Sequence, residues 1–275
     1  MNLSKRLIIN ADDFGACREV NMAVMQIARA GILGGASVLA NGIGWQQAVD
    51  FLRDNLELSA GIHLNVVEGR AISAAPEVRI LTDRDGLFPG LSTLLKRWML
   101  RPFAVSRAVE IEWRAQIERL MRVGVWLRHA DSHQHLHAFP PAYGCAVRLC
   151  QEYGIPALRH PSEKGTWPIR RKSALALQSS LAISQRVTRR TGLRHNDNFL
   201  GFRRVGAYGV TELIEDLRRI PYGLTEIALH PSMKDGVPYP KLNGDLERKT
   251  LLDDSLPGRI KGLGIELITW STILQ

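Results

Sequence analysis

The chain has 275 residues, of which 45% are hydrophobic and 23% are charged, and its formal net charge at pH 7 is +9. These values are ordinary for a folded protein, and they exclude a disordered or low-complexity chain. No stretch approaches the roughly 20 apolar residues of a membrane span. We therefore expect one domain over residues 1–275, because α/β barrels commonly reach this length without dividing.

The first predicted strand is the apolar run 7–9, which leads into Asn-Ala-Asp-Asp-Phe-Gly at 10–15. Adjacent strand residues point to opposite faces, so Asp12 and Asp13 can act separately only if the backbone turns, and Gly15 permits that turn. One aspartate could then bind a cation while the other stays free as a base. In the alternative interpretation, an aspartate caps the amphipathic helix predicted at 16–30.

The second predicted strand, at 58–65, has an apolar interior that is interrupted by His63. A single histidine in a strand is usually a core or edge residue whose hydrogen bonds are satisfied. The segment 66–104 interrupts the alternation of strands and helices, and we expect lid loops or extra helices there. A long amphipathic helix is predicted at 105–123 and a short buried strand at 123–129.

Four of the eight histidines follow within nine residues: His129, His133, His135 and His137. Neutral imidazole is a common metal ligand, and packing alone gives little reason for histidines at alternate positions beside an aspartate. The last three would share one face of a strand, whereas His133 and His137 would share one face of a helix. The alternative is a set of loop histidines that hydrogen bonds satisfy.

Helices are predicted at 142–153 and 211–220, and strands at 155–159 and 225–229. The last of these strands ends on His230, and Pro231 stops it. The aspartates and three of the histidines thus lie at the ends of four different strands. A barrel assembles one site from distant sequence in this way, because ligand and catalytic groups collect at the carboxyl ends of its strands.

A second insertion, at 162–210, carries much of the positive charge among apolar residues. Such a basic amphipathic helix is typical of a contact with an anionic membrane or a phosphorylated ligand, and the alternative is a solvated helix face. No nucleic-acid motif accompanies the charge, so we expect no nucleic-acid partner. The three cysteines cannot all pair and lack zinc-finger spacing, which favours buried thiols in a reducing compartment.

The motifs together resemble those of the YdjC-type carbohydrate deacetylases, a family that includes chitooligosaccharide deacetylases and hopanoid-associated deacetylases. The matching motifs are ADDFG at 11–15, GIHLN at 61–65, DSHQHLH at 131–137 and LHP at 229–231. They occur in the family's order and span most of the chain. The resemblance implies an α/β fold, a distorted (β/α) barrel related to the polysaccharide deacetylases.

By motif position, the resemblance implies that Asp13, His63 and His133 bind one divalent cation, Zn²⁺ or Mg²⁺. Asp12 takes the position of the general base, and His230 that of the general acid. The residues leave open whether His137 rather than His133 is the ligand. His135 and His137 are otherwise expected near the ligands or facing the substrate.

The resemblance implies removal of the N-acetyl group from an N-acetylated amino sugar, an oligosaccharide or a glycolipid, with release of acetate. Two other functions stay open: a metal hydrolase of another amide or ester on the same scaffold, and a non-enzymatic binder of anionic surfaces or nucleic acid. Because residues 1–6 pass straight into a strand without a signal peptide, we expect a cytoplasmic enzyme. The basic insertion adds the expectation of peripheral contact with the inner membrane surface.

Overall fold

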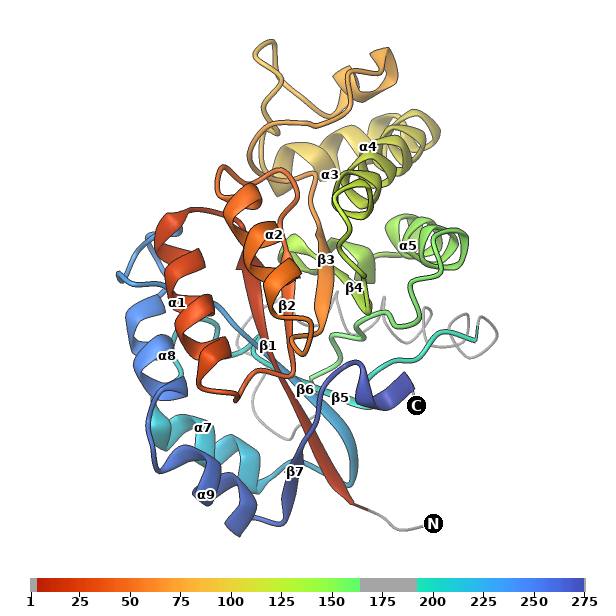
Figure 1. Ribbon diagram of the computed structural model, residues 1–275. Helices are drawn as coiled ribbons and strands as arrows, with labels where there is room; N and C mark the ends of the chain where they lie inside the picture. Colours follow the sequence, from red (N-terminus) through yellow and green to blue (C-terminus); the bar gives the residue numbers. More distant parts are fainter. Residues whose placement is uncertain (1–3, 164–191, 275) are drawn as a thin grey trace.

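The computed structural model describes residues 4–163 and 192–274. One parallel sheet has the order β4-β3-β2-β1-β6-β5, and β7 pairs with the first residues of β1 (Figure 1). Its strands are β1 (Lys5–Phe14), β2 (Gly35–Val38), β3 (Ala60–Leu64), β4 (His129–Ser132), β5 (Asn198–Leu200), β6 (Gly223–Leu229) and β7 (Ile265–Leu267). The strands predicted at 7–9, 58–65 and 225–229 are confirmed as β1, β3 and β6.

The sheet curls, and the segment 155–159 lies beside β4 at one edge of the sheet. Ala130 of β4 bridges to Leu158, and Ala157 bridges to Arg194, a few residues before β5. These bridges are isolated, so the sheet forms a curled and incomplete barrel rather than a closed one. This confirms the distorted (β/α) barrel, although the strand predicted at 155–159 is present only as isolated bridges.

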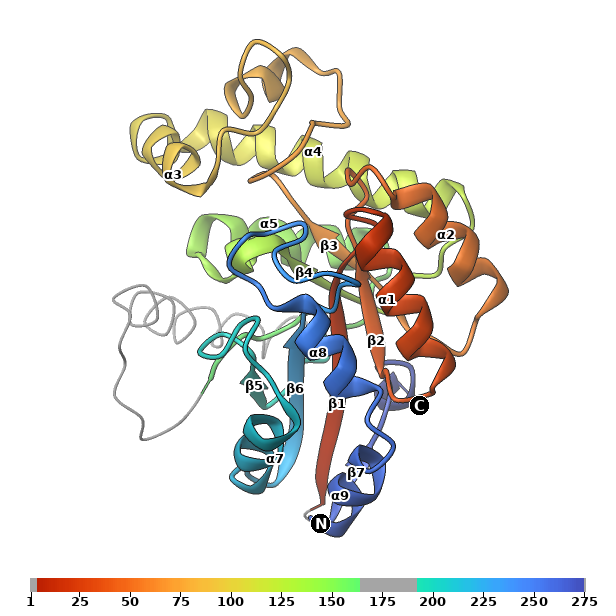
Figure 2. The ribbon, with the colours of Figure 1, turned by 90° about the vertical axis from the view of Figure 1, so that its left-hand side faces the viewer.

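Helices surround the sheet, as both views show (Figures 1 and 2). They are α1 (Arg18–Arg29), α2 (Trp45–Asp54), α3 (Leu91–Leu100), α4 (Pro102–Arg122), α5 (Pro140–Glu152), α7 (Val210–Arg218), α8 (Gly244–Leu251) and α9 (Leu256–Gly262), with short 3₁₀ helices η1 (Pro76–Ile80), η2 (His133–Ala138) and η3 (Thr272–Leu274). The helices predicted at 16–30, 105–123, 142–153 and 211–220 are confirmed. None of the described helices is long and apolar enough to cross a membrane.

The strand predicted at 123–129 is wrong, because α4 continues to Arg122 and Gly124, with a φ of 84°, turns the chain after it. Pairing with β3 begins only where the Arg128 N–H donates to the Ala60 carbonyl. β4 then covers 129–132, so that Asp131 lies within the strand and His133 directly follows its end.

The insertion at 66–104 contains η1 and α3, and buried polar side chains of α4 fix it in place. Glu112 accepts hydrogen bonds from the Ile72 and Ser73 N–H groups, at 3.0 and 2.9 Å. Of the second insertion, 164–191 lies outside the described residues, and the expected basic amphipathic helix lies there as well.

Alternate residues of β1 face two different environments, as the period of a strand requires. Leu7 and Ile9 belong to the large apolar cluster that includes buried residues of the surrounding helices. Ile8 belongs to a small separate cluster with Leu224 and Trp270. Two residues further along the same face comes Asn10, and then Asp12, both fully or almost fully buried. The inside of the barrel thus changes from apolar to polar toward the carboxyl ends of the strands.

Candidate metal centre

Asp12 and Asp13 face different partners because β1 is irregular where they lie. The register between β1 and β2 shifts between Ala11 and Phe14, and Asp13 has a φ of 62°. Asp12 continues the inward face of the strand, whereas Asp13 faces His63 of β3 and His133, which follows β4. The sequence predicted such a turn, although it assigned the turn to Gly15 alone. The alternative role as a helix cap is wrong, because the cap residue of α1 is Cys17.

Asp13, His63 and His133 come together at the carboxyl ends of β1, β3 and β4. Asp13 Oδ1 lies 3.3 Å from His63 Nε2 and 3.0 Å from His133 Nδ1. The three side chains offer ligand atoms within 4.8 Å of one another, and all three are buried. One carboxylate and two imidazoles are a donor set that catalytic zinc sites use.

Backbone strain is concentrated at this group. Within the described ranges, the non-glycine residues with a positive φ are Asp13, Gln134 and His135. Each such conformation costs on the order of 1–3 kcal/mol, and such residues cluster at functional sites. Gln134 and His135 directly follow His133, so the strained turn sets the direction of that imidazole.

Two polar atoms of the group have no hydrogen-bond partner among the described residues: Asp13 Oδ2 and His133 Nε2. A buried carboxylate oxygen without a partner is costly, and a cation would satisfy it. His63 is oriented from behind, because its Nδ1 lies 2.6 Å from Asp131 Oδ1. Carboxylates behind ligating histidines have this role in many metal sites. The residues present therefore fit a divalent cation.

The charges in the group favour ionised side chains. Burial would raise the pKa of Asp13, but the nearby His133 and His63 hold it well below its usual range. Burial alone would lower the pKa of His63, yet Asp131 and Asp13 raise it to about 10. Asp13 likewise raises the pKa of His133 to about 9 against the effect of burial. Negative charge at this place therefore attracts protons, and it would attract a metal ion for the same reason.

Asp12, His63 and Asp131 form a second group with ligand atoms close enough to hold a metal. The Arg159 guanidinium already occupies it, with 2.7 Å contacts to both Asp12 oxygens and to Asp131 Oδ2. Glu226 lies 2.9 Å from Arg159 Nε and completes a buried ion network. A cation there would meet the positive guanidinium, so we assign the metal to the group of Asp13.

The network behind Asp12 was missed from the sequence. Arg159 was seen only as the last residue of a predicted strand, and Asp131 only as a neighbour of the histidines. A charged residue at the end of an apolar strand was the available signal, because buried charges must be paired. The Arg159 guanidinium holds the pKa of Asp12 below its usual value, although burial acts in the opposite direction.

The other three histidines of the 129–137 stretch do not join the group. His137 Nδ1 lies 2.6 Å from Ser132 Oγ and Nε2 lies 2.9 Å from the Arg159 carbonyl, so both nitrogens are engaged. His129 stacks on Trp270. His135, within η2, lies against the rings of Phe199 and Phe202. Burial lowers the pKa of His129 to about 3 and that of His137 to about 4. The sequence predicted that histidines of this stretch share one face of a strand or of a helix. Both predictions are wrong, because His133–Ala138 forms a short 3₁₀ helix, η2, that is kinked.

His230 directly follows β6 and lies beside Asp13. Its Nε2 lies 4.0 Å from Asp13 Oδ2, and its side chain is partly exposed. The His230 N–H donates to Glu247 at 2.6 Å, which fixes the backbone there. The five site residues predicted from the sequence are thus gathered at one end of the barrel.

The rim of the centre is formed by residues that the sequence did not single out. The Tyr239 ring lies 5.4 Å from the His133 ring, centroid to centroid. Glu68 Oε2 lies 3.8 Å from His133 Nε2, and Gln134 Nε2 donates to Glu68 Oε1 at 3.2 Å. These side chains come from the segments after β3, β4 and β6.

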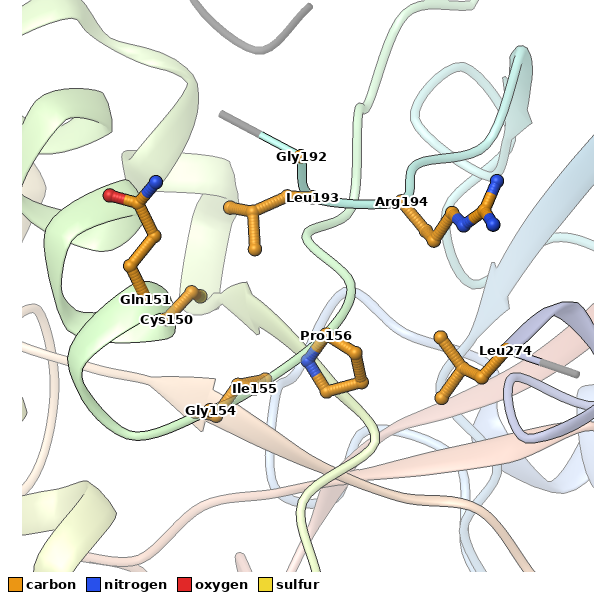
Figure 3. Close-up of a pocket in the computed structure, with 9 residues that line it drawn as sticks. All are labelled: Cys150, Gln151, Gly154, Ile155, Pro156, Gly192, Leu193, Arg194 and Leu274. Carbon is orange, nitrogen blue, oxygen red and sulfur yellow. The ribbon is translucent and has the colours of Figure 1, made fainter. Parts of the chain in front are cut away.

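A separate cavity of about 390 Å³ lies between the end of α5, the 192–194 segment and η3 (Figure 3). None of the residues of the metal centre lines it. Its lining combines polar and apolar groups, and burial raises the pKa of the lining Cys150 thiol to about 12. None of the described residues that line it belongs to a group that could hold a metal ion, so we place the candidate chemistry at the metal centre.

The fold and the site together define an α/β-barrel protein with a candidate metal centre at the carboxyl ends of its strands. The family model described as YdjC-like protein matches residues 6–261. The chain therefore belongs to the YdjC-like family, and the resemblance seen in the motifs is confirmed.

Two relatives from distant organisms carry the same name. A protein of Brevibacillus brevis named carbohydrate deacetylase is 30% identical over 274 residues, which span 98% of this chain and 99% of that protein. A protein of Danio rerio with the same name is 29% identical over 243 residues, which span 86% of this chain and 73% of that protein. A crystal structure from Enterococcus faecalis, described as a cellobiose-phosphate cleavage protein, has a TM-score of 0.77 at 23% identity over 98% of this chain and 99% of that chain, and it supports the fold.

Proposed function

We propose that this protein is a metal-dependent carbohydrate deacetylase that removes the N-acetyl group from an N-acetylated amino sugar and releases acetate. The observation that carries the proposal is the group of Asp13, His63 and His133, with Asp12 beside it and His230 across from it. The name shared by the family's relatives supports the substrate class.

Asp13, His63 and His133 would hold one divalent cation. When bound, the cation supplies Lewis-acid chemistry: it polarises the acetamide carbonyl and acidifies a water molecule. The carboxylate and two imidazoles suit Zn²⁺, and Mg²⁺ is the alternative. His137 is not needed as a ligand, because both of its nitrogens are hydrogen-bonded.

Asp12 is the proposed general base. Arg159 keeps it ionised at neutral pH, and the two N–H groups of the guanidinium fix the plane of the carboxylate. Among the described residues, Arg159 is the one hydrogen-bond donor to Asp12 Oδ2, so a lone pair remains for a proton of the attacking water. Proton transfer of this kind contributes roughly 10²–10⁴-fold to a rate.

His230 is the proposed general acid. Its Nε2 lies near Asp13 Oδ2, whereas the two proposed histidine ligands lie near Oδ1, and its side chain is less buried than theirs. A proton on its Nε2 would pass to the amine nitrogen when the carbon–nitrogen bond breaks. The products are then a free amino sugar and acetate.

The test is acetate release from N-acetylglucosamine oligosaccharides and N-acetylated glycolipids, using metal-stripped protein with Zn²⁺, Mg²⁺ or Mn²⁺ restored. We expect metal-dependent release that Asp12→Asn reduces by roughly 10²-fold or more while metal binding stays intact. Calorimetric titration of the metal is the control. Loss of metal in Asp12→Asn would make Asp12 a ligand and reject its role as the base.

A second candidate function is hydrolysis of another amide or an ester on the same scaffold. The metal group and the base would serve any of these bonds, so only the substrate panel distinguishes them. Absence of acetate release from every sugar, with metal bound, would favour this alternative and reject the deacetylase.

We also propose a cytoplasmic enzyme with peripheral contact to an anionic membrane through the basic 162–210 insertion, and no nucleic-acid partner. The support is the sequence pattern of the insertion, of which 164–191 lies outside the described residues. Such contact would suit a glycolipid substrate better than a free oligosaccharide. Activity on a glycolipid in vesicles and on the free sugar would distinguish the two.

A further inference from the structure

The turn between α3 and α4 exposes large apolar side chains to solvent. Met99, Leu100 and Phe103 are 77%, 81% and 90% exposed. Single exposed apolar residues are common on soluble proteins, but three within five residues form a patch. We name the surface of residues 96–107 the α3–α4 tip.

The α3–α4 tip is also basic. Lys96, Arg97, Arg101 and Arg107 lie in it, and no acidic residue occurs between Asp85 and Glu110. Arg97 donates to backbone carbonyls, and Arg107 pairs with Glu77 at 3.7 Å. Within the described part of the chain, Lys96 and Arg101 have no acidic partner at ion-pair distance, and both are exposed. Lys96 and Arg101 therefore place positive charge without an acidic partner beside the apolar patch.

The tip is held rigidly, so its exposed side chains are not the loose end of a helix. Trp98 and Val105 are buried on the inner side of the hairpin, and Trp98 Nε1 donates to Ser106 Oγ at 2.9 Å. The inner faces of α3 and α4 thus use their own apolar residues. Met99, Leu100 and Phe103 therefore do not pack in the hairpin and face solvent.

We propose that the α3–α4 tip docks on an anionic lipid bilayer, with Met99, Leu100 and Phe103 entering the interface and Lys96 and Arg101 contacting lipid phosphates. Apolar side chains beside basic ones are the combination by which peripheral proteins bind such membranes. A second copy of this chain fits less well, because a symmetric contact would bring the same basic residues together.

α3 and α4 lie beyond the carboxyl end of β3 in both views (Figures 1 and 2), and the metal centre lies at the carboxyl ends of the strands. α4 connects the tip to the metal centre, because Gln116 exchanges hydrogen bonds with the backbone of Asn65, two residues after His63. Phe103 and Gln116 are 13 positions apart on one helix, or about 20 Å at 1.5 Å per residue. Docking would therefore turn this end of the barrel toward the bilayer. The inference does not depend on the proposed deacetylation.

The test is sedimentation of the full chain with vesicles of phosphatidylcholine alone or mixed with phosphatidylglycerol. We expect binding only to the mixed vesicles, weakened by salt, and at least a tenfold loss when Met99→Ser, Leu100→Ser and Phe103→Ser are combined. The matched control combines Ile43→Ser and Leu56→Ser, which change exposed apolar residues elsewhere. Unchanged circular dichroism and metal affinity show that the variants are folded.

A local readout separates the tip from the basic insertion. Cys17, Cys145 and Cys150 are buried, so Met99→Cys can be labelled selectively with a polarity-sensitive dye. We expect a blue shift of its emission on addition of the mixed vesicles. Wild-type protein that binds no vesicle, a tip variant that binds as well as wild type, or a dye that reports only concentration-dependent dimers would each overturn the proposal.

Discussion

His230 and Asp12 have separate roles in the proposed reaction, and the leaving group can distinguish them. An amine leaves poorly without a proton, whereas a nitrophenolate leaves readily as an anion. We expect His230→Gln to lower kcat/KM for an acetamido sugar by roughly 10²–10⁴-fold and to change nitrophenyl acetate hydrolysis far less. Parallel kinetics on both substrates make the measurement. Equal losses on both would contradict a general-acid role, because proton donation would then not be the missing function.

Glu226 gives the folded state a pH dependence of its own. It is fully buried, and burial raises its pKa to about 7, against the effect of Arg159, from an ordinary value of 4.5. The folded protein therefore keeps a proton that the unfolded chain loses between about pH 4.5 and 7. Stability from this group is present below pH 4.5 and falls as the pH rises through 7.

The neutral isostere Glu226→Gln should remove that dependence. Between pH 5 and 8, we expect the free energy of unfolding of wild type to fall by about 1–3 kcal/mol more than that of the variant. Urea unfolding at several pH values provides the comparison, on metal-free protein. Parallel curves for the two proteins would show that Glu226 is ionised throughout this range.

At the scale of residues, the sequence identified the polar side chains that gather at the site but not what lies behind them. Asp12, Asp13, His63, His133 and His230 stood out because each interrupts or ends an apolar strand. Which partner each side chain contacts could not be predicted, since Arg159 reaches Asp12 across the barrel rather than along the chain.

Among the elements, β3 shows how closely the strands near the site approach one another. A side chain at Gly61 would place its Cβ 2.2 Å from His129 Nε2, and the His129 ring cannot yield easily because it stacks on Trp270. The glycine is thus required by the packing inside the barrel, two residues before His63.

Gly61→Ala should therefore displace β3 and the proposed metal ligand that it carries, His63. We expect a loss of about 1–3 kcal/mol in stability and a weaker affinity for metal. Gly258→Ala in α9 is the matched control, because its Cβ would meet nothing within 4 Å. Thermal unfolding and metal titration of both variants give the result. A Gly61→Ala protein with wild-type metal affinity would show that β3 adjusts without moving His63.

Hydrophobic periodicity predicted the helices and strands with uneven success, because it does not show which segments pair with a neighbouring strand. Long amphipathic helices such as α4 and strands bounded by turns, such as β6, follow from hydrophobic periodicity. The β4 strand was placed too early, because the apolar residues at 123–127 follow the helix without pairing to a neighbour. Only hydrogen bonding to β3 decides where that strand begins.

On the scale of the whole molecule, the metal centre joins chain segments that are far apart in the sequence. Asp13 lies near the end of the first strand, β1. His63 follows about 50 residues later, and His133 a further 70 residues on. A cation held by all three binds the folded state only, so it should stabilise the protein by mass action.

We expect Zn²⁺ at about one hundred times its dissociation constant to add about 2.7 kcal/mol to the free energy of unfolding. The effect should appear as a higher Tm in thermal scans and should be reversed by a chelator. Asp13→Asn keeps the local backbone conformation, because asparagine tolerates a positive φ, and it should abolish most of the shift. If that variant shows the same metal-induced rise in Tm, the ion binds at another site.

By itself, the sequence determined the strand-and-helix alternation, the family and the residues of the candidate site, since these depend on periodicity and on motifs of neighbouring residues. Only the tertiary structure decided that one histidine of the 129–137 stretch, His133, enters the metal group. It also decided that Arg159 occupies the second possible metal group, which contains Asp12. Those choices depend on a strained backbone after His133 and on charges that must be paired inside the barrel.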